Sequence, residues 1–281
     1  MEILSSHAHP LTIHIHTSTP ETFFVNSYLV ETAAGIVVID TQFVLSQARA
    51  VKAQLDALGR PLAAIIITHP HPDHFNGTAL LLEGRSNVPV YATPLTVQGI
   101  QAIEAAKRTE WKGKYGDDYP DQTYIPTHLI PSGKTVAIGG LTWRFEDLGP
   151  GEAANETVIV VDEVNILFCG DVMYHHVHSW LVEGRSSAWL AQLGTVLQHY
   201  KGIERIYPGH GRPTTLRALN DEVDYINTYQ SLVRAELERS GSISPESKAG
   251  IKAQILQRYP ATWPLASLID YNIDGISKEL G

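Results

Sequence analysis

Short apolar segments separated by polar turns fill most of the chain, and longer amphipathic segments follow near its end. Leu11, Ile13 and Ile15 alternate with polar residues, and this period of two predicts a half-buried strand. Segments 22–31 and 35–40 flank a turn-like Ala-Ala-Gly and predict a hairpin. The almost continuously apolar segment 62–68 is typical of a strand that is buried on both faces.

A second group of apolar segments predicts further strands at 135–140, 141–148, 156–162, 165–171 and 204–211. Helical periodicity is found at 44–58, at 77–83, from Pro94 onwards and at 188–200. Two strand-rich halves, each with helices on its outside, predict an α/β fold of four layers, an αββα sandwich.

The segment 109–127 interrupts this pattern, because aromatic residues are mixed there with Lys, Gly, Asp and Pro. We expect a long, partly irregular excursion containing Trp111, Tyr115, Tyr119 and Tyr124. Loops of this length in compact domains are often functional lids. The alternative is a surface insertion whose aromatic side chains pack on the body of the protein.

The last part of the chain is predicted to be helical. Leu216, Leu219, Val223 and Ile226 recur at intervals of three or four, which indicates one face of an amphipathic helix. Ser244 and Pro245 are a favourable N-cap and first residue for another helix. We therefore expect a catalytic domain over residues 1–216 and a helical extension over 217–281 that packs on it.

Composition narrows the possible partners of this 281-residue chain. Its formal charge is −9, with 30 acidic against 21 basic residues, and it has no basic run of the kind that binds nucleic acid. No apolar run is long enough to span a bilayer, and the first residues do not resemble a signal peptide. A cytoplasmic protein is therefore expected. The single cysteine, Cys169, is predicted to be a small buried side chain rather than a nucleophile.

Four side chains that can bind metal follow directly after the buried segment 62–68: His69, His71, Asp73 and His74. If buried, each would carry a desolvation cost unless it were paired or coordinated. Histidines two residues apart can converge from one side of an extended loop, while the last two side chains face a neighbouring point. The motif predicts two metal ions. Imidazole and carboxylate suit zinc, with manganese, iron or cobalt as alternatives.

This motif resembles the HxHxDH signature of the metallo-β-lactamase superfamily, and further matches follow in order. Asp171 follows a strand, as the family's metal-bridging Asp does, and His210 lies in a Pro-Gly-His-Gly turn like the family's late histidine. Asp40, at the end of a predicted strand, resembles the Asp that supports the ligands from behind. The resemblance covers about residues 20–215 and implies the family's sandwich fold and a hydrolase with two divalent metals.

One position departs from the family pattern. The third histidine normally lies in a Gly-Pro-Gly-His turn, but this chain has Glu152 there, which resembles the alkyl sulfatase branch of the superfamily. The resemblance implies one metal held by His69, His71 and Glu152. It implies a second metal held by Asp73, His74 and His210, with Asp171 bridging the two. The alternative is that Glu152 points away and the first site is weak or empty.

Other residues are predicted to surround this centre. Asp73, as the family pattern implies, would orient the attacking water as well as bind metal. The loop after Asp171 contains Tyr174, His175, His176 and His178, and we expect Tyr174 and His178 to contact substrate or transfer a proton. Arg185 could bind an anionic group of the substrate, although a structural salt bridge is its commoner role. His14 and His16 are expected to be exposed to solvent.

The predicted reaction is metal-assisted attack of water on an ester or lactone bond of a small, partly apolar molecule. A sulfate-ester hydrolase and a β-lactam hydrolase of the same fold are alternatives. A mononuclear iron dioxygenase acting on sulfur compounds is another alternative, and a protein with purely structural metals is the last. No nucleic-acid or membrane partner is expected, and the protein could form a homo-oligomer.

Overall fold

Two sheets form the centre of the protein in a computed structural model that describes residues 2–5 and 10–281. The first has strand order β1-β2-β3-β4-β5-β6-β7 and the second β12-β11-β10-β9-β8. The strands of the first sheet are β1 Glu2–Ser5, β2 Pro10–Thr17, β3 Asn26–Thr32, β4 Gly35–Ile39, β5 Leu62–Ile66, β6 Val90–Ala92 and β7 His128–Leu129. Those of the second are β8 Lys134–Ile138, β9 Leu141–Gly149, β10 Glu156–Val161, β11 Ile166–His175 and β12 Arg205–Gly211.

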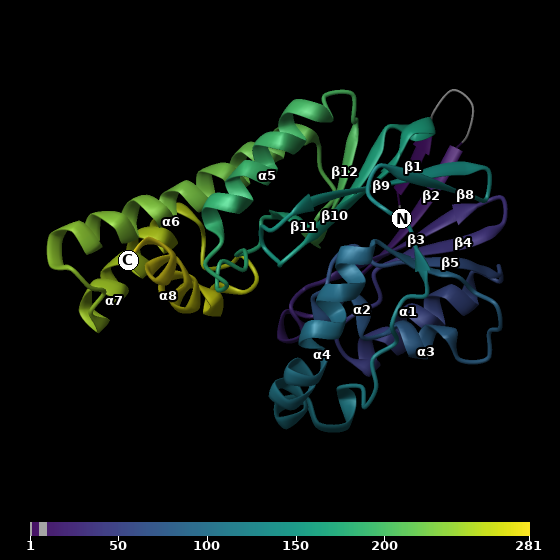
Figure 1. The fold of residues 1–281 in the computed structure, drawn as a ribbon, viewed down its shortest axis with the longest axis horizontal. Helices are drawn as coiled ribbons and strands as arrows, with labels where there is room; N and C mark the ends of the chain where they lie inside the picture. Colours follow the sequence, from purple (N-terminus) through teal and green to yellow (C-terminus); the bar gives the residue numbers. More distant parts are fainter. Residues whose placement is uncertain (1, 6–9) are drawn as a thin grey trace.

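Helices cover the outer face of each sheet, as Figure 1 shows. The α-helices are α1 Leu45–Ala57, α2 Pro72–Phe75, α3 Thr78–Leu82, α4 Pro94–Tyr115, α5 Ser186–His199, α6 Leu219–Ser240, α7 Pro245–Arg258 and α8 Ile269–Leu280. Short 3-10 helices span Pro20–Thr22, Gly116–Asp118, Asp162–Val164, Leu216–Ala218 and Ala266–Leu268. The first four α-helices belong to the first sheet and the last four to the second. The predicted αββα sandwich with a helical C-terminal region is confirmed.

Alternation along the buried strands creates the layers. In β4, Val37 and Ile39 face the apolar core between the two sheets, whereas Ile36 and Val38 pack under the helices of the first half. Strands β4 to β7 are parallel neighbours, so the segments that follow them emerge at one edge of the sheet. Strand β11 is likewise parallel to β12, which brings the ends of these two strands together.

The helical extension packs on the outer face of the second sheet. Ile226, Val233, Ile273 and Ile276 are buried in one cluster with Leu193 of α5 and other apolar side chains. Helix α6 begins at Leu219, close to the predicted start of the extension at residue 217. Among the described residues, no helix combines the length and apolar character that crossing a membrane requires.

The predicted irregular excursion at 109–127 is wrong in its first part. Helix α4 continues to Tyr115 and ends at Gly116, which has a φ of 55°. Trp111 and Tyr115 lie one helical turn apart and pack with Phe43, as does Tyr119. Trp111 and Tyr115 thus belong to an amphipathic helix, whereas Tyr119 and Tyr124 lie beyond its end. The contacts with Phe43 agree with the alternative that these aromatic side chains pack on the body of the protein, and Trp111 also lines a pocket.

The prediction that His14 and His16 are exposed is also wrong. His14 Nε2 lies 2.7 Å from Glu31 Oε1 on the neighbouring strand, and His16 Nε2 lies 3.0 Å from Gln47 Oε1 on α1. The polar face of β2 is thus partly covered by side chains of β3 and α1. Cys169 is buried, as expected.

Asn272 of α8 is expected to fix the extension to the loop that follows β11. It is fully buried, its side-chain amide donates to Ser179 O at 2.8 Å, and its carbonyl accepts from Leu181 N at 2.8 Å. Replacing Asn272 by Leu leaves both backbone groups without partners, so the free energy of unfolding should fall by about 2–4 kcal/mol. Urea denaturation followed by circular dichroism measures this change.

The neighbouring Tyr271, whose side chain is 60% exposed, provides the control. Tyr271→Ala should change the unfolding free energy by less than about 0.5 kcal/mol. Equal stability of the Asn272→Leu and Tyr271→Ala variants would show that the buried amide does not anchor the extension.

Candidate metal centre

The His-rich motif lies where the chain leaves β5 and enters α2. Asp40, which directly follows β4, holds this segment in place through its carboxylate. Its Oδ1 accepts from Thr68 N at 2.9 Å, and its Oδ2 accepts from Thr68 Oγ1 at 2.8 Å and lies 2.8 Å from His74 Nδ1. Asp40 has a φ of 59°, a conformation that is uncommon for residues other than glycine but is tolerated by Asp. With Nδ1 of His74 held in this way, its Nε2 faces the interior of the site.

Three more side chains that can bind metal come from the second half of the chain and lie next to this motif. Asp171 lies in β11, His210 in β12, and Glu152 in the turn between β9 and β10. His210 Nδ1 lies 2.7 Å from Phe23 O, which leaves its Nε2 for the site. Gly209 allows these strands to approach, because a Cβ there would lie 1.9 Å from Asp171 Oδ1 and 2.9 Å from His74 Cε1.

These side chains form two groups with the spacing of metal ligands. His69, His71, Glu152 and Asp171 make one group, and Asp73, His74 and His210 make the other. In the first group, His71 Nδ1 lies 3.0 Å and His69 Nε2 lies 3.9 Å from Glu152 Oε2. In the second, Asp73 Oδ2 lies 3.3 Å from His210 Nε2 and 3.6 Å from His74 Nε2.

Asp171 joins the two groups. Its Oδ1 lies 3.3 Å from His74 Nε2, and its Oδ2 lies 3.1 Å from His210 Nε2 and 3.7 Å from His69 Nε2. The carboxylate is buried, and these distances show that it faces ligand atoms of both groups at once. This is the arrangement that a carboxylate bridging two ions requires.

The residues present fit divalent metal ions. Five buried atoms that face this space have no hydrogen-bond partner among the described residues: Nε2 of His69, His74 and His210, Oε2 of Glu152, and Oδ1 of Asp171. Polar atoms that are buried without partners are rare and costly in folded proteins. Imidazole nitrogens and carboxylate oxygens also form a donor set that suits zinc and similar ions.

The electrostatics of the site show how strongly these groups interact. Burial would raise the pKa of Asp73, but His74 and His210 outweigh it and lower that pKa to about 2. Burial would lower the pKa of His210, but Asp171 and Asp73 raise it to about 9. For Glu152, burial dominates and raises its pKa to about 7 despite the neighbouring His71. The carboxylates thus depend on nearby positive charge, which bound cations would supply.

Glu152 lies where the sequence analysis expected it, 2% exposed and facing the first group. Its turn is held by Glu156, whose Oε1 accepts from Ala153 N at 3.1 Å. Arg185 donates to the backbone oxygens of the same turn, from Nε to Gly151 at 3.1 Å and from Nη2 to Glu152 at 2.9 Å. Arg185 also pairs with Glu183 and is therefore a structural residue of the site, which is the role that was expected to be the commoner one.

Glu183, which was not among the predicted site residues, lies behind His71. Glu183 Oε1 is 3.0 Å from His71 Nε2, and its other oxygen pairs with Arg185. Although burial would raise the pKa of Glu183, His71 and Arg185 lower it to about 2, so it is ionised. A carboxylate that accepts from the distal nitrogen of a histidine orients the ring toward a metal. No sequence motif marked Glu183, because its role depends on the contact with His71, which is distant in the sequence.

Strand β11 continues through His175, so the predicted loop after Asp171 begins later than expected. Its two predicted catalytic residues, Tyr174 and His178, have different surroundings. Tyr174 donates from its hydroxyl to Asp171 Oδ2 at 2.7 Å, and its ring stacks on His210 with centroids 4.5 Å apart. His178 does not reach the centre. Its Nδ1 lies 3.1 Å from Tyr225 Oη and its Nε2 lies 3.3 Å from Pro260 O, because the C-terminal extension covers this part of the loop. The proposed role of His178 in catalysis is therefore not supported.

His175 and His176 also lie outside the site. His175 Nδ1 is 2.8 Å from Arg212 O, and the exposed His176 stacks on Trp263 with centroids 5.2 Å apart. Of the four residues suggested for this loop, only Tyr174 lines the pocket over the ligand groups.

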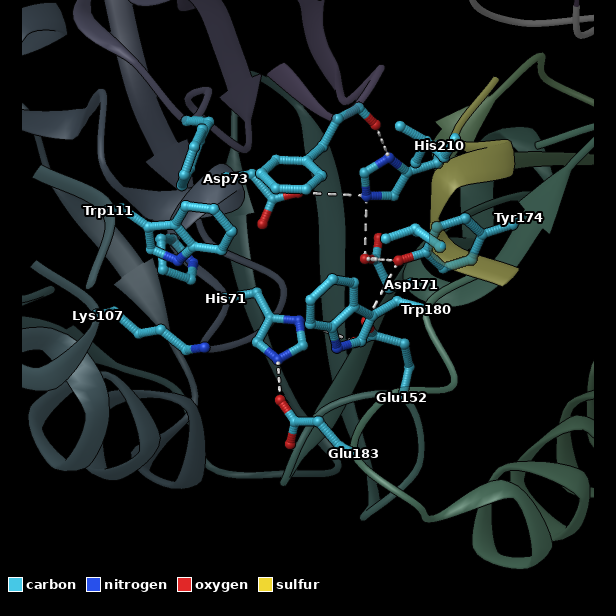
Figure 2. A pocket seen from close by; sticks show the side chains of 15 residues that line it. His71, Asp73, Lys107, Trp111, Glu152, Asp171, Tyr174, Trp180, Glu183 and His210 are labelled. Atoms are coloured by element: carbon cyan, nitrogen blue, oxygen red, sulfur yellow. Dashed lines mark hydrogen bonds and ion pairs between the residues drawn. The ribbon is translucent and has the colours of Figure 1, made fainter. Parts of the chain in front are cut away.

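That pocket opens over both ligand groups. Figure 2 shows His71, Asp73, Asp171 and His210 around its base, with Trp111 and Trp180 beside them. Its remaining lining residues are Phe23, Phe43, Pro72, Lys107, Glu152, Tyr174, Glu183, Leu265 and Leu268. A concave site with an apolar wall and a few convergent polar groups is typical of small-molecule binding.

A substitution at Gly209 tests the positions of Asp171 and His74, because both side chains lie close to this glycine. Gly209→Ala should displace Asp171 and His74 and weaken metal binding at both groups at least about tenfold. Competition with a chromophoric chelator measures the affinities. Gly202→Ala is the matched control, since a Cβ there meets nothing within 4 Å. Equal metal affinities in the two variants would contradict the bridging position of Asp171.

Glu183 should affect the metal affinity of the first ligand group only. Glu183→Ala removes the acceptor behind His71 and should weaken binding of one metal by about 10–100-fold while the other is retained. Cobalt titration followed by visible absorption distinguishes the two sites. Glu279→Ala, which removes a carboxylate that binds Ser186 and Ser187 at the start of α5, is the control. If both sites keep their affinity in Glu183→Ala, the carboxylate has no role in orienting His71.

Comparisons with known proteins agree with this fold and site. A hydroxyacylglutathione hydrolase from Cupriavidus metallidurans is 30% identical over 169 residues, which is 58% of this chain and 56% of that protein. A linear primary-alkylsulfatase from a Pseudomonas species is 23% identical over 231 residues, which is 69% of this chain and 43% of that protein. The chain thus spans about half the length of these relatives.

A solved beta-lactamase domain protein from Burkholderia ambifaria shares the fold. Its TM-score is 0.68 at 19% identity, with 95% of this chain and 84% of that chain covered. The sequence model of the metallo-beta-lactamase superfamily matches residues 20–210, a range that contains every member of both ligand groups. The chain therefore belongs to the metallo-beta-lactamase superfamily.

Proposed function

We propose that this protein is a hydrolase that uses two divalent metal ions to cleave an ester, thioester or lactone bond of a small molecule. The observation that carries the proposal is the position of Asp171, whose two oxygens face both ligand groups at the base of an apolar pocket. The name of one relative, the hydroxyacylglutathione hydrolase, supports acyl transfer to water.

Each ligand group would hold one ion, with zinc as the first candidate and manganese or iron as alternatives. Two such ions would supply a hydroxide at neutral pH and would polarise the oxygen of the scissile carbonyl. Asp73, whose carboxylate lies at the pocket side of the second group, would accept a hydrogen bond from the attacking water and orient it.

Tyr174 would fix the bridging carboxylate. Burial raises the pKa of its hydroxyl well above the ordinary value, and Asp171 adds to this effect, so the group remains a hydrogen-bond donor. Because the ring also stacks on His210, one side chain limits the movement of a ligand from the second group and of the shared carboxylate. We assign Tyr174 this positioning role.

A sulfate-ester hydrolase is the second candidate function. Glu152 would take the place of the usual histidine, as the resemblance to the alkyl sulfatase branch implies, and the chain aligns with a linear primary-alkylsulfatase over 231 residues. An additional carboxylate in the first group would make a bound water less acidic and would favour harder cations than an all-histidine group does.

The proposal predicts metal-dependent acid release from carboxylic esters. Protein stripped with chelator should be inactive and should regain activity when zinc, manganese or iron(II) is added. Glu152→Gln should lower kcat/KM by about 100-fold or more through loss of a ligand. Glu246→Gln, at an exposed position in α7, should have no effect. A pH-stat with ester, thioester and lactone panels measures the reaction.

Three parallel assays separate the alternatives. Sulfate release from alkyl sulfates without acyl hydrolysis would favour the second candidate, and opening of β-lactams alone would indicate that class of substrate. Oxygen consumption with a single bound iron would contradict the two-metal hydrolase.

A further inference from the structure

The pocket over the metal centre carries its charges unevenly. Four carboxylates line it: Asp73, Glu152, Asp171 and Glu183. Three of them belong to the ligand groups, and Glu183 is paired with His71 and Arg185. Lys107 is the only lysine or arginine among the described residues that line the pocket. Its amine is thus the one cationic group there that neither holds nor supports a ligand.

Lys107 extends from α4 into this space. In Figure 2 its side chain points from the helix toward the pocket, on the side where His71 and Glu183 lie. Its side chain is only 25% exposed, so most of its length is covered by the protein. A lysine whose stem lies along apolar surface presents its charged end at a defined place.

Lys107 pairs with Glu110, and this ion pair would compete only weakly with an anionic ligand for the Lys107 amine. Lys107 Nζ lies 3.1 Å from Glu110 Oε2, three residues along the same helix, and the Glu110 side chain is 52% exposed. Ion pairs of this type on an exposed helix face contribute little to stability. An anionic group inside the pocket would meet the same amine in a less solvated place, where the attraction is stronger.

The rest of the wall is apolar. Phe23, Phe43, Trp111, Trp180, Leu265 and Leu268 line the pocket together with Lys107. Phe23 and Phe43 each pack edge to face with Trp111, which makes this part of the wall rigid. A ligand that reaches both the metal centre and Lys107 therefore needs a carbon body between two polar ends.

We propose that Lys107 binds a carboxylate at the end of the substrate remote from the scissile bond, so that the preferred substrates are hemiesters of dicarboxylic acids. This inference rests on the proposed function and names its substrate class. The metal centre would engage the ester group, the aromatic wall would contact the carbon chain, and Lys107 would form a charge-assisted hydrogen bond with the free carboxylate.

The test compares monomethyl adipate with methyl hexanoate, two esters of equal chain length that differ in the terminal carboxylate. The wild-type protein should prefer monomethyl adipate. In Lys107→Met, the ratio of kcat/KM for the hemiester over the neutral ester should fall about 10–100-fold, mainly through a higher KM. Lys107→Arg should retain most of the ratio. Lys112→Met, on the same helix outside the lining residues, should leave the ratio at the wild-type value.

Binding of the product acids, measured by calorimetry, tests the carboxylate subsite independently of the proposed hydrolysis. Adipate should bind the metal-loaded wild-type protein more tightly than hexanoate does, and Lys107→Met should remove that difference even if neither ester is hydrolysed. Equal binding of the two acids to the wild-type protein would overturn the carboxylate subsite. So would a kcat/KM ratio that is the same in the wild-type protein and Lys107→Met. Absence of hydrolysis combined with Lys107-dependent adipate binding would instead contradict the ester hydrolase and retain the subsite.

Discussion

The buried carboxylate of Asp171 is the group on which the site depends. It lies among imidazoles of both halves of the chain, and burial of such a charge is costly unless cations or hydrogen bonds compensate it. His210 and His74 lower its pKa well below the ordinary value although burial acts in the opposite direction. The packing of β11 against β12, the missing side chain at Gly209 and the hydroxyl of Tyr174 all keep this carboxylate at the centre.

The rest of the structure brings ligands from distant parts of the chain to this point. Asp40 orients His74 from the first sheet, whereas Arg185 and Glu183 connect the turn of Glu152 with His71. The C-terminal extension reaches the same region through Asn272, which binds the backbone of the loop between β11 and α5. Helices that lie far from the metal ligands in sequence therefore shape the pocket wall.

Much of this was predictable from local sequence. A continuous apolar strand that ends in His69, His71, Asp73 and His74 indicated both the strand and the metal site, because no packing explanation accommodates four such side chains. Asp171 and His210 were recognisable through the resemblance of their motifs to the superfamily pattern, although the structure places them within β11 and β12 rather than after strands. The length of α4 could not be predicted. The Lys, Gly and Asp residues between Trp111 and Tyr119 obscured a helical spacing that tertiary packing stabilises. Contacts made across the fold, such as Glu183 with His71, leave no local pattern. The same limit explains His178, which the sequence placed near the site and the extension holds away from it.

The central claim is that two ions share Asp171, with Glu152 as a ligand of the first. Crystals of the protein loaded with zinc, measured on both sides of the zinc absorption edge, test this directly. The account predicts two anomalous peaks per chain, one among His69, His71 and Glu152 and the other among Asp73, His74 and His210, with an oxygen of Asp171 bound to each. A single peak, or a first peak without Glu152 in its coordination, would contradict it.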